Sequence, residues 1–172
     1  RILAPLLNIK PGEPYLASRL AELSRSLSNA GYFKRVDVLP NVTKADADHQ
    51  VPLTIALRAK SNNEVEVGIG YSTDEGPRLS TSWEKPWINS LGHSLKTNLK
   101  ISAPKQDISV VYKIPRGDPL NHYYTIQGGY QMLDQKDTKS DRLVTSVHRW
   151  DKDTDGWTRD VFVRAEHESY TQ

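Results

Sequence analysis

Three aspartates near the C-terminal end of the sequence have the spacing of a calcium-binding loop. In the stretch WDKDTDGW, Asp151, Asp153 and Asp155 precede Gly156, as in the first half of an EF-hand loop. Such a loop also needs a carboxylate at its twelfth position and a helix on each side. The twelfth residue counted from Asp151 is Phe162, and the flanks are rich in β-branched and aromatic residues. We therefore predict that DKDTDG is a turn between two strands, since Asp and Gly favour tight turns, and we expect no metal site.

The histidines offer no catalytic arrangement either. No Ser-His-Asp or H-E-x-x-H arrangement is visible, and the histidines are scattered along the chain: His49, His93, His122, His148 and His167. His148 and His167 have acidic neighbours in the sequence, but solvated strand positions are the simpler interpretation of both. We predict no catalytic residue, no cofactor and no enzymatic activity.

Composition narrows the choice of protein class. The 23 basic residues nearly balance the 21 acidic ones, so nothing indicates a nucleic-acid partner. There is no cysteine, which excludes disulfides and thiolate metal sites. No apolar run approaches the length of a transmembrane helix. The mean hydropathy of -0.62 is polar, but a membrane β-barrel keeps such an average because its lipid-facing residues alternate with polar ones.

The first sixty residues indicate a small α/β unit. Apolar residues recur at spacings of four and three from Leu16 to Ala30, which predicts one face of an amphipathic helix. Gly31 follows at the position of a helix C-cap, and two strand-like runs come next, YFKRVDVLPNV and VPLTIALRA. One helix and two strands bury little apolar surface, so we expect an earlier strand to complete this domain. We assign residues 1–61 to it.

Residues 62–172 alternate strand-like runs with turns and contain no convincing helix. Seven runs of about ten residues are joined by segments rich in Gly, Pro, Asn and Asp, which predicts an antiparallel meander. The early runs alternate clearly: Leu95, Leu99 and Ile101 lie opposite Lys96, Asn98 and Lys100. The sixth run, RLVTSVHRW, gives no clean face. A sheet with one apolar and one polar face must cover something with the apolar face.

Two coverings are possible. A soluble sandwich or barrel would turn the apolar face inward, and a membrane barrel would turn it outward into lipid. Strands of about ten residues, tilted near 40°, span the apolar band of an outer membrane of about 25 Å, whereas most strands of soluble proteins have about five or six residues. Strand length therefore favours the membrane barrel.

In a meander every second turn lies at the same end of the sheet. Aromatic residues gather beside three turns that share one end in this way. They are Trp87, Tyr123, Tyr124, Trp150 and Trp157. Such clustering is typical of the aromatic girdle at a membrane–water interface, and we predict that these five residues are interface anchors. In a soluble protein the same residues would be ordinary core or rim residues.

Specific blocks of this sequence resemble a known family. GIGYSTDEGPRLSTSWEKPWINSLGHSL, VVYKIP and YYTIQGGYQ are similar to the first barrel strands of the TamA family, the outer-membrane subunits of translocation and assembly modules and relatives of BamA. KPGEPYLASRLAELSRSLSNAGYFKRVDVLP resembles the later part of the last POTRA (polypeptide-transport-associated) domain of that family. The resemblance implies an α+β partial POTRA domain followed by the N-terminal part of a sixteen-stranded transmembrane β-barrel. We therefore expect the chain to be a piece of a longer protein.

The family's activity implies a role in inserting β-barrel proteins, including autotransporters, into the bacterial outer membrane, with the POTRA part in the periplasm. Its implied partners are a long inner-membrane-anchored TamB-like protein, unfolded outer-membrane protein clients and the lipid bilayer. A transport pore of the two-partner-secretion type, which shares the POTRA-plus-barrel plan, is the alternative.

The first barrel strand would then form a lateral gate by pairing weakly with the last strand. This strand consists of Val65, Glu66, Val67, Gly68, Ile69, Gly70 and Tyr71. Glycine weakens a strand because it has no side chain to pack, so Gly68 and Gly70 suit a gate that opens for an incoming strand. The alternative is that both glycines only relieve crowding inside the barrel.

Overall fold

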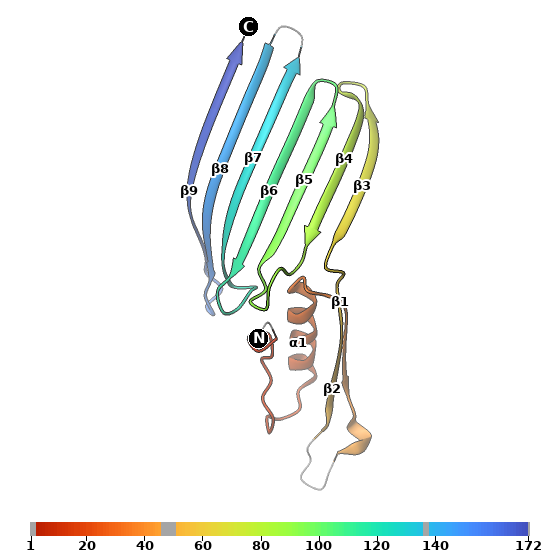
Figure 1. Cartoon of the computed structure of the whole chain (residues 1–172). Coiled ribbons are helices and arrows are strands. Elements are labelled where there is room, and N and C mark those ends of the chain that lie inside the picture. Colours follow the sequence, from red (N-terminus) through yellow and green to blue (C-terminus); the bar gives the residue numbers. More distant parts are fainter. Residues whose placement is uncertain (1–2, 46–50, 136–137, 172) are drawn as a thin grey trace.

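The computed structural model describes residues 3–45, 51–135 and 138–171, and its strands form two separate sheets (Figure 1). The first part contains helix α1 (Ala17–Asn29), strand β1 (Phe33–Pro40), a short 3-10 helix (Val42–Lys44) and strand β2 (Leu53–Ala59). The predicted leucine stripe forms α1, since Leu23 and Leu27 are fully buried, and Gly31 follows the helix with a φ of 82°. β1 and β2 pair antiparallel from Phe33 with Ala59 to Pro40 with Leu53.

The second part is one antiparallel sheet of seven strands in sequence order. Its strands are β3 (Glu64–Ser72), β4 (Gly76–Lys85), β5 (Ser94–Ser102), β6 (Lys105–Pro115), β7 (His122–Gln135), β8 (Thr138–Lys152) and β9 (Thr158–Thr171). The meander predicted from the turns is confirmed. The sheet curves into an open arc, and the turns after β4, β6 and β8 lie at the end nearest α1 (Figure 1).

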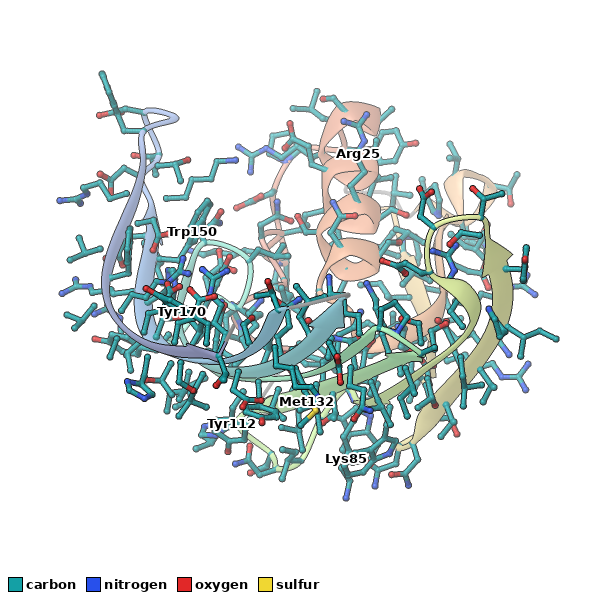
Figure 2. The ribbon with its side chains drawn as sticks, turned by 90° about the horizontal axis from the view of Figure 1, so that it is seen from above. Arg25, Lys85, Tyr112, Met132, Trp150 and Tyr170 are labelled. Atoms are coloured by element: carbon teal, nitrogen blue, oxygen red, sulfur yellow. The ribbon has the colours of Figure 1, made fainter. Side chains whose placement is uncertain are left out.

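Residues directly opposite each other in an antiparallel sheet lie on the same face, so the register assigns every side chain to a face. One row across the sheet is Val67, Thr81, Leu99, Ile108, Tyr130 and Leu143. The adjacent row is Gly68, Ser80, Lys100, Asp107, Gln131 and Arg142. In Figure 2, Tyr112 and Met132 lie outside the arc and Trp150 lies inside it. The apolar face is therefore the convex one and the polar face the concave one, as the alternation predicted for a membrane barrel.

The sixth strand does alternate, although its sequence gave no clean face. Leu143 and Val147 lie in the convex rows, while Val144 and Trp150 lie in the concave ones. The concave face also carries aromatic stacks: His148 with Phe162 at 5.0 Å between ring centroids, and Tyr123 with Trp150 at 6.0 Å. In the sequence of β8, the apolar and aromatic residues on the concave side concealed the alternation of polar and apolar positions.

The buried core lies where the two parts meet. Leu6, Leu23, Leu27 and Tyr32 form it, and none of them is more than 6% exposed. Trp87, from the turn after β4, and Leu120, from the turn after β6, pack against this cluster. The α/β unit is thus fastened to the turns of the large sheet by a shared apolar contact.

Candidate functional site

β3 is an edge strand in the part of the chain that the structure describes. It pairs with β4 through nine consecutive residues, from Glu64 opposite Glu84 to Ser72 opposite Gly76. No described strand lies on its other side. An edge strand presents a row of unpaired backbone N–H and C=O groups, onto which another strand can add.

The apolar side chains of β3 are among the most exposed of the convex face. Val65, Val67, Ile69 and Tyr71 have exposed fractions of 64%, 69%, 88% and 76%. Leu99, in the middle of β5, is only partly exposed because β4 and β6 flank it. The edge strand therefore offers open backbone groups and a continuous apolar side-chain row together.

Gly68 and Gly70 lie on the concave side of β3, where they make room for side chains of β4. A Cβ atom at Gly68 would lie 2.7 Å from Ser80 Oγ, and one at Gly70 would lie 2.8 Å from Arg78 Nε. Ser80 Oγ also donates a hydrogen bond to the Gly68 carbonyl at 3.3 Å. This geometry supports the crowding interpretation of the two glycines, although it leaves β3 with fewer side-chain contacts.

The five aromatic residues predicted as a common membrane-facing girdle do not share a face. Tyr123 and Trp150 point to the concave side, where they stack on each other and Lys113 Nζ lies 4.0 Å above the Tyr123 ring. Trp87 packs against the buried core. These three side chains therefore do not lie on the convex face, because neighbouring strand residues point to opposite faces and the turn after β4 folds back onto α1. Their role at a membrane–water interface stays a prediction. Tyr124, on the convex side, and Trp157, 76% exposed, remain predicted anchors.

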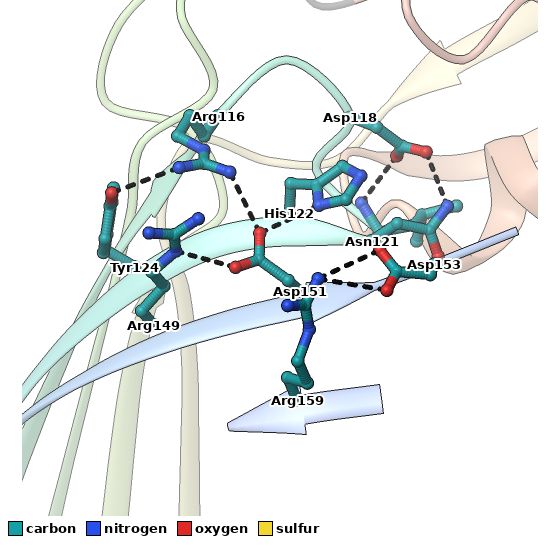
Figure 3. A network of polar contacts seen from close by, with 10 residues as sticks. Arg116, Asp118, Asn121, His122, Tyr124, Arg149, Asp151, Asp153 and Arg159 are labelled. Atoms are coloured by element: carbon teal, nitrogen blue, oxygen red, sulfur yellow. Dashed lines mark hydrogen bonds and ion pairs between the residues drawn. The ribbon is translucent and has the colours of Figure 1, made fainter. Parts of the chain in front are cut away.

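The DKDTDG segment ends β8 with Asp151 and Lys152 and then forms the hairpin turn to β9. Asp153 N–H donates to the Trp157 carbonyl at 2.8 Å, and Gly156 has a φ of 85°. Within the described residues no group of three or more acidic or histidine side chains is arranged to hold a metal ion. The aspartates bind arginines instead: Asp151 pairs with Arg116 and Arg149, and Asp153 pairs with Arg159 (Figure 3).

A buried hydrogen bond joins the α/β unit to the large sheet. Tyr32 Oη donates to the Gly92 carbonyl at 2.9 Å, across 60 residues of sequence. Gly92 has a φ of 81°, and a Cβ there would lie 2.6 Å from Tyr32 Oη. Burial raises the pKa of Tyr32 to about 12. The sequence did not reveal this hydrogen bond. It shows a Gly-Tyr-Phe run and a glycine in a turn, but nothing that pairs one with the other.

Among the described residues, no helix has both the length and the apolar character needed to cross a membrane.

Two comparisons with known proteins bear on this architecture. Residues 1–60 match the family model POTRA, described as "Surface antigen variable number repeat". The whole chain is similar to a crystal structure of BamA from Haemophilus ducreyi that lacks POTRA domains 1-3, with a TM-score of 0.68 and 14% sequence identity. The match covers 99% of this chain and 33% of the BamA chain, so this chain spans about a third of its length. The likeness establishes the fold: a POTRA-type α/β unit followed by seven antiparallel strands arranged as in a BamA barrel.

Proposed function

We propose that this chain forms the end of a last POTRA domain and the first seven strands of the barrel of a TamA-type outer-membrane protein. The complete protein would insert or assemble β-barrel proteins such as autotransporters. The POTRA part would lie in the periplasm, and a TamB-like protein anchored in the inner membrane would be its partner. The proposal involves no catalytic residue, no cofactor and no nucleic acid.

The observation that carries this proposal is the convex face. Large apolar side chains are exposed across the sheet from β3 to β9, including Ile69 at 88% and Val163 at 77%. Exposed apolar side chains that continue across seven strands differ from the single scattered apolar residues of ordinary soluble surfaces, and such a face suits contact with acyl chains. The sequence blocks GYSTDEGPR and WEKPW support the TamA type within this fold.

Strand addition at β3 is the proposed mechanism. The unpaired edge of β3 supplies backbone donors and acceptors that an incoming client strand can bind. In the complete barrel the last strand would cover this edge, and the seam between the two strands would open to admit the client. The chemistry is hydrogen bonding alone, so neither a nucleotide nor a reactive side chain is required.

A reversible crosslink tests the mechanism. This part of the sequence has no cysteine. In a complete protein otherwise free of cysteine, Val67→Cys paired with a cysteine in the last strand would form one defined disulfide across the seam. The measurement is the assembly of a client autotransporter in membranes, with the seam oxidised and then reduced. We expect assembly to fall on oxidation and to recover on reduction, because the locked seam cannot expose its backbone groups.

A matched control uses the other side of the same strand. Val67→Cys with Thr81→Cys would link β3 to β4, which are already paired, and should leave assembly unchanged. Full client assembly with the seam demonstrably crosslinked would exclude strand addition at this gate. Equal losses from both crosslinks would point to general stiffening of the sheet.

A further inference from the structure

A cluster of polar side chains interrupts the convex face at the end nearest α1. We call it the rim cluster; its members are Arg116, His122, Tyr124, Arg149 and Asp151. Arg116 follows β6, the next two residues belong to β7, and the last two belong to β8 (Figure 3). The proposed gate lies at the opposite edge of the sheet and does not use this cluster.

One carboxylate organises the cluster. Asp151 is 8% exposed, and its two oxygens accept hydrogen bonds from Arg116 Nη2 at 3.0 Å and Arg149 Nε at 2.7 Å. His122 Nδ1 lies 3.0 Å from the same oxygen that Arg116 binds. The side chains of the two arginines are 45% and 50% exposed. The negative charge is thus enclosed and the guanidinium groups face outward, with two positive charges against one negative charge.

Two of the neighbouring acids, Asp118 and Asp153, are already bound. Asp153 pairs with Arg159 at 3.0 Å. Asp118 accepts hydrogen bonds from the Leu120 N–H at 2.9 Å and from Asn121 Nδ2 at 2.6 Å. These two acids therefore do not neutralise the excess positive charge of the rim cluster on the convex side.

The cluster lies directly at the end of exposed apolar columns. Tyr124, Arg149 and Val161 form one cross-strand row. The corresponding row two residues further along the strands is Ile126, Val147 and Val163, with exposed fractions of 48%, 50% and 77%. Tyr124 joins the two regions, because its ring is on the apolar face and its hydroxyl accepts a hydrogen bond from Arg116 Nη1 at 3.3 Å.

We propose that the rim cluster binds the phosphodiester of an anionic glycerophospholipid in the membrane leaflet beside these turns. Arg116 and Arg149 would donate hydrogen bonds to the phosphate oxygens, which match the planar guanidinium groups. The acyl chains would lie along Ile126, Val147 and Val163. This inference rests on the proposed function, which places the convex face in lipid.

The other face of the sheet carries a second group in which arginines surround a carboxylate. Arg142 and Arg164 both bind Glu166, and the register places all three on the concave side. This group also has two arginines around one carboxylate, but it does not adjoin the exposed apolar columns of the convex face. It is therefore a matched control for charge without the lipid-facing position.

The test uses the complete protein that carries this chain, purified in detergent. Palmitoyl-oleoyl phosphatidylglycerol is added, and native mass spectrometry measures the fraction of protein that retains it. We expect the affinity to fall about fivefold for each arginine lost, and so about 25-fold in the double variant Arg116→Gln and Arg149→Gln. The double variant Arg142→Gln and Arg164→Gln should bind as the unmodified protein does. Arg149→Lys, which keeps the charge, should recover part of the loss caused by Arg149→Gln.

Folding is checked in each variant by heat-modifiable migration on gels. If the double variant does not fold, the single variant Arg149→Gln serves in its place, because it keeps the ion pair of Arg116 with Asp151. Equal retention of the lipid by both double variants and the unmodified protein would overturn the site. Equal losses in both double variants would overturn it too, because long-range charge would then explain the binding. Competition by millimolar inorganic phosphate would assign the cluster to free phosphate instead. Failure of the proposed membrane function would give a different result. Neither phosphatidylglycerol nor phosphatidylcholine, added separately, would then be retained by the unmodified protein or by any variant.

Discussion

The hydroxyl of Tyr32, beside the end of helix α1, donates a hydrogen bond of 2.9 Å to the carbonyl of Gly92, in the turn between β4 and β5. Tyr32 belongs to the buried core of the α/β unit, and Gly92 is itself buried. The bond therefore ties the two parts of the fold at a point that water does not reach, where an unpaired hydroxyl would be costly.

This joint can be measured by a double-mutant cycle. Tyr32→Phe should cost about 1 kcal/mol of unfolding free energy, through the lost hydrogen bond. Gly92→Ala should cost roughly 1–3 kcal/mol, because alanine is strained at a positive φ and its Cβ meets the tyrosine hydroxyl. The two costs should sum to more than that of the double variant, since removing the hydroxyl relieves the contact. Additive costs in denaturant unfolding would show that the two residues do not interact.

Alkaline pH should weaken the same joint. Burial raises the pKa of Tyr32 from 10.0 to about 12, so the folded state holds the phenolic proton more tightly than the unfolded chain does. The stabilisation is complete below pH 10 and is lost as the pH rises towards 12, in total about 2–3 kcal/mol. Tyr32→Phe should remove this component from the pH profile of the unfolding free energy. Tyr15→Phe, at a position 48% exposed, is the control and should leave the profile unchanged.

The two faces of β5 should tolerate opposite substitutions. Leu99 lies on the convex face between Thr81 and Ile108, and Lys100 lies on the concave face between Ser80 and Asp107. Leu99→Arg should destabilise the complete barrel by about 2–4 kcal/mol if it lies near the middle of the bilayer. Lys100→Leu should cost much less. Folding titrations into lipid vesicles measure both, and equal costs would contradict an outward apolar face.

Substitutions at the two glycines of β3 should have different costs, because a side chain at each would meet a different residue of β4. Gly68→Ala should destabilise the barrel by about 1–3 kcal/mol through contact with Ser80 Oγ, and adding Ser80→Ala should restore most of that loss. Gly70→Ala should cost less, because the Arg78 side chain that it meets is long and can move. Thermal unfolding of the four proteins gives the comparison. If Ser80→Ala restores nothing, Gly68 serves some purpose other than making room for that side chain.

Calcium should have no effect on the turn after β8. Asp151 already accepts hydrogen bonds from two arginines, and Asp153 binds Arg159. We predict no calcium-dependent change in structure or stability at micromolar calcium, and no difference when Asp151, Asp153 and Asp155 are all replaced by Asn. A saturable calorimetric signal that disappears in the triple variant would reveal a site.

Local patterns in the sequence predicted the elements well. The spacing of leucines predicted α1, and alternation with turn residues predicted the seven-stranded meander, because both depend on neighbours within a few positions. It was harder to predict on which face of the sheet the aromatic side chains beside the turns lie. Tyr123 and Tyr124 are adjacent, so one must point inward and the other outward, and nothing local decides which. Two contacts could not be predicted at all: the hydrogen bond of Tyr32 with Gly92 and the ion pair of Arg116 with Asp151. Both join residues that are distant in the sequence, so they become visible only once the strand register is known.

The shared core at the end of α1 also has a consequence for the order of folding. Trp87 and Leu120 come from two different hairpins, yet both pack against the buried cluster, whose residues all precede them in the chain. The α/β unit is synthesised first, and its apolar surface is then available when these hairpins emerge. It can therefore act as a template that brings the ends of β4 to β7 together before the sheet closes, which shortens the search for the correct strand register.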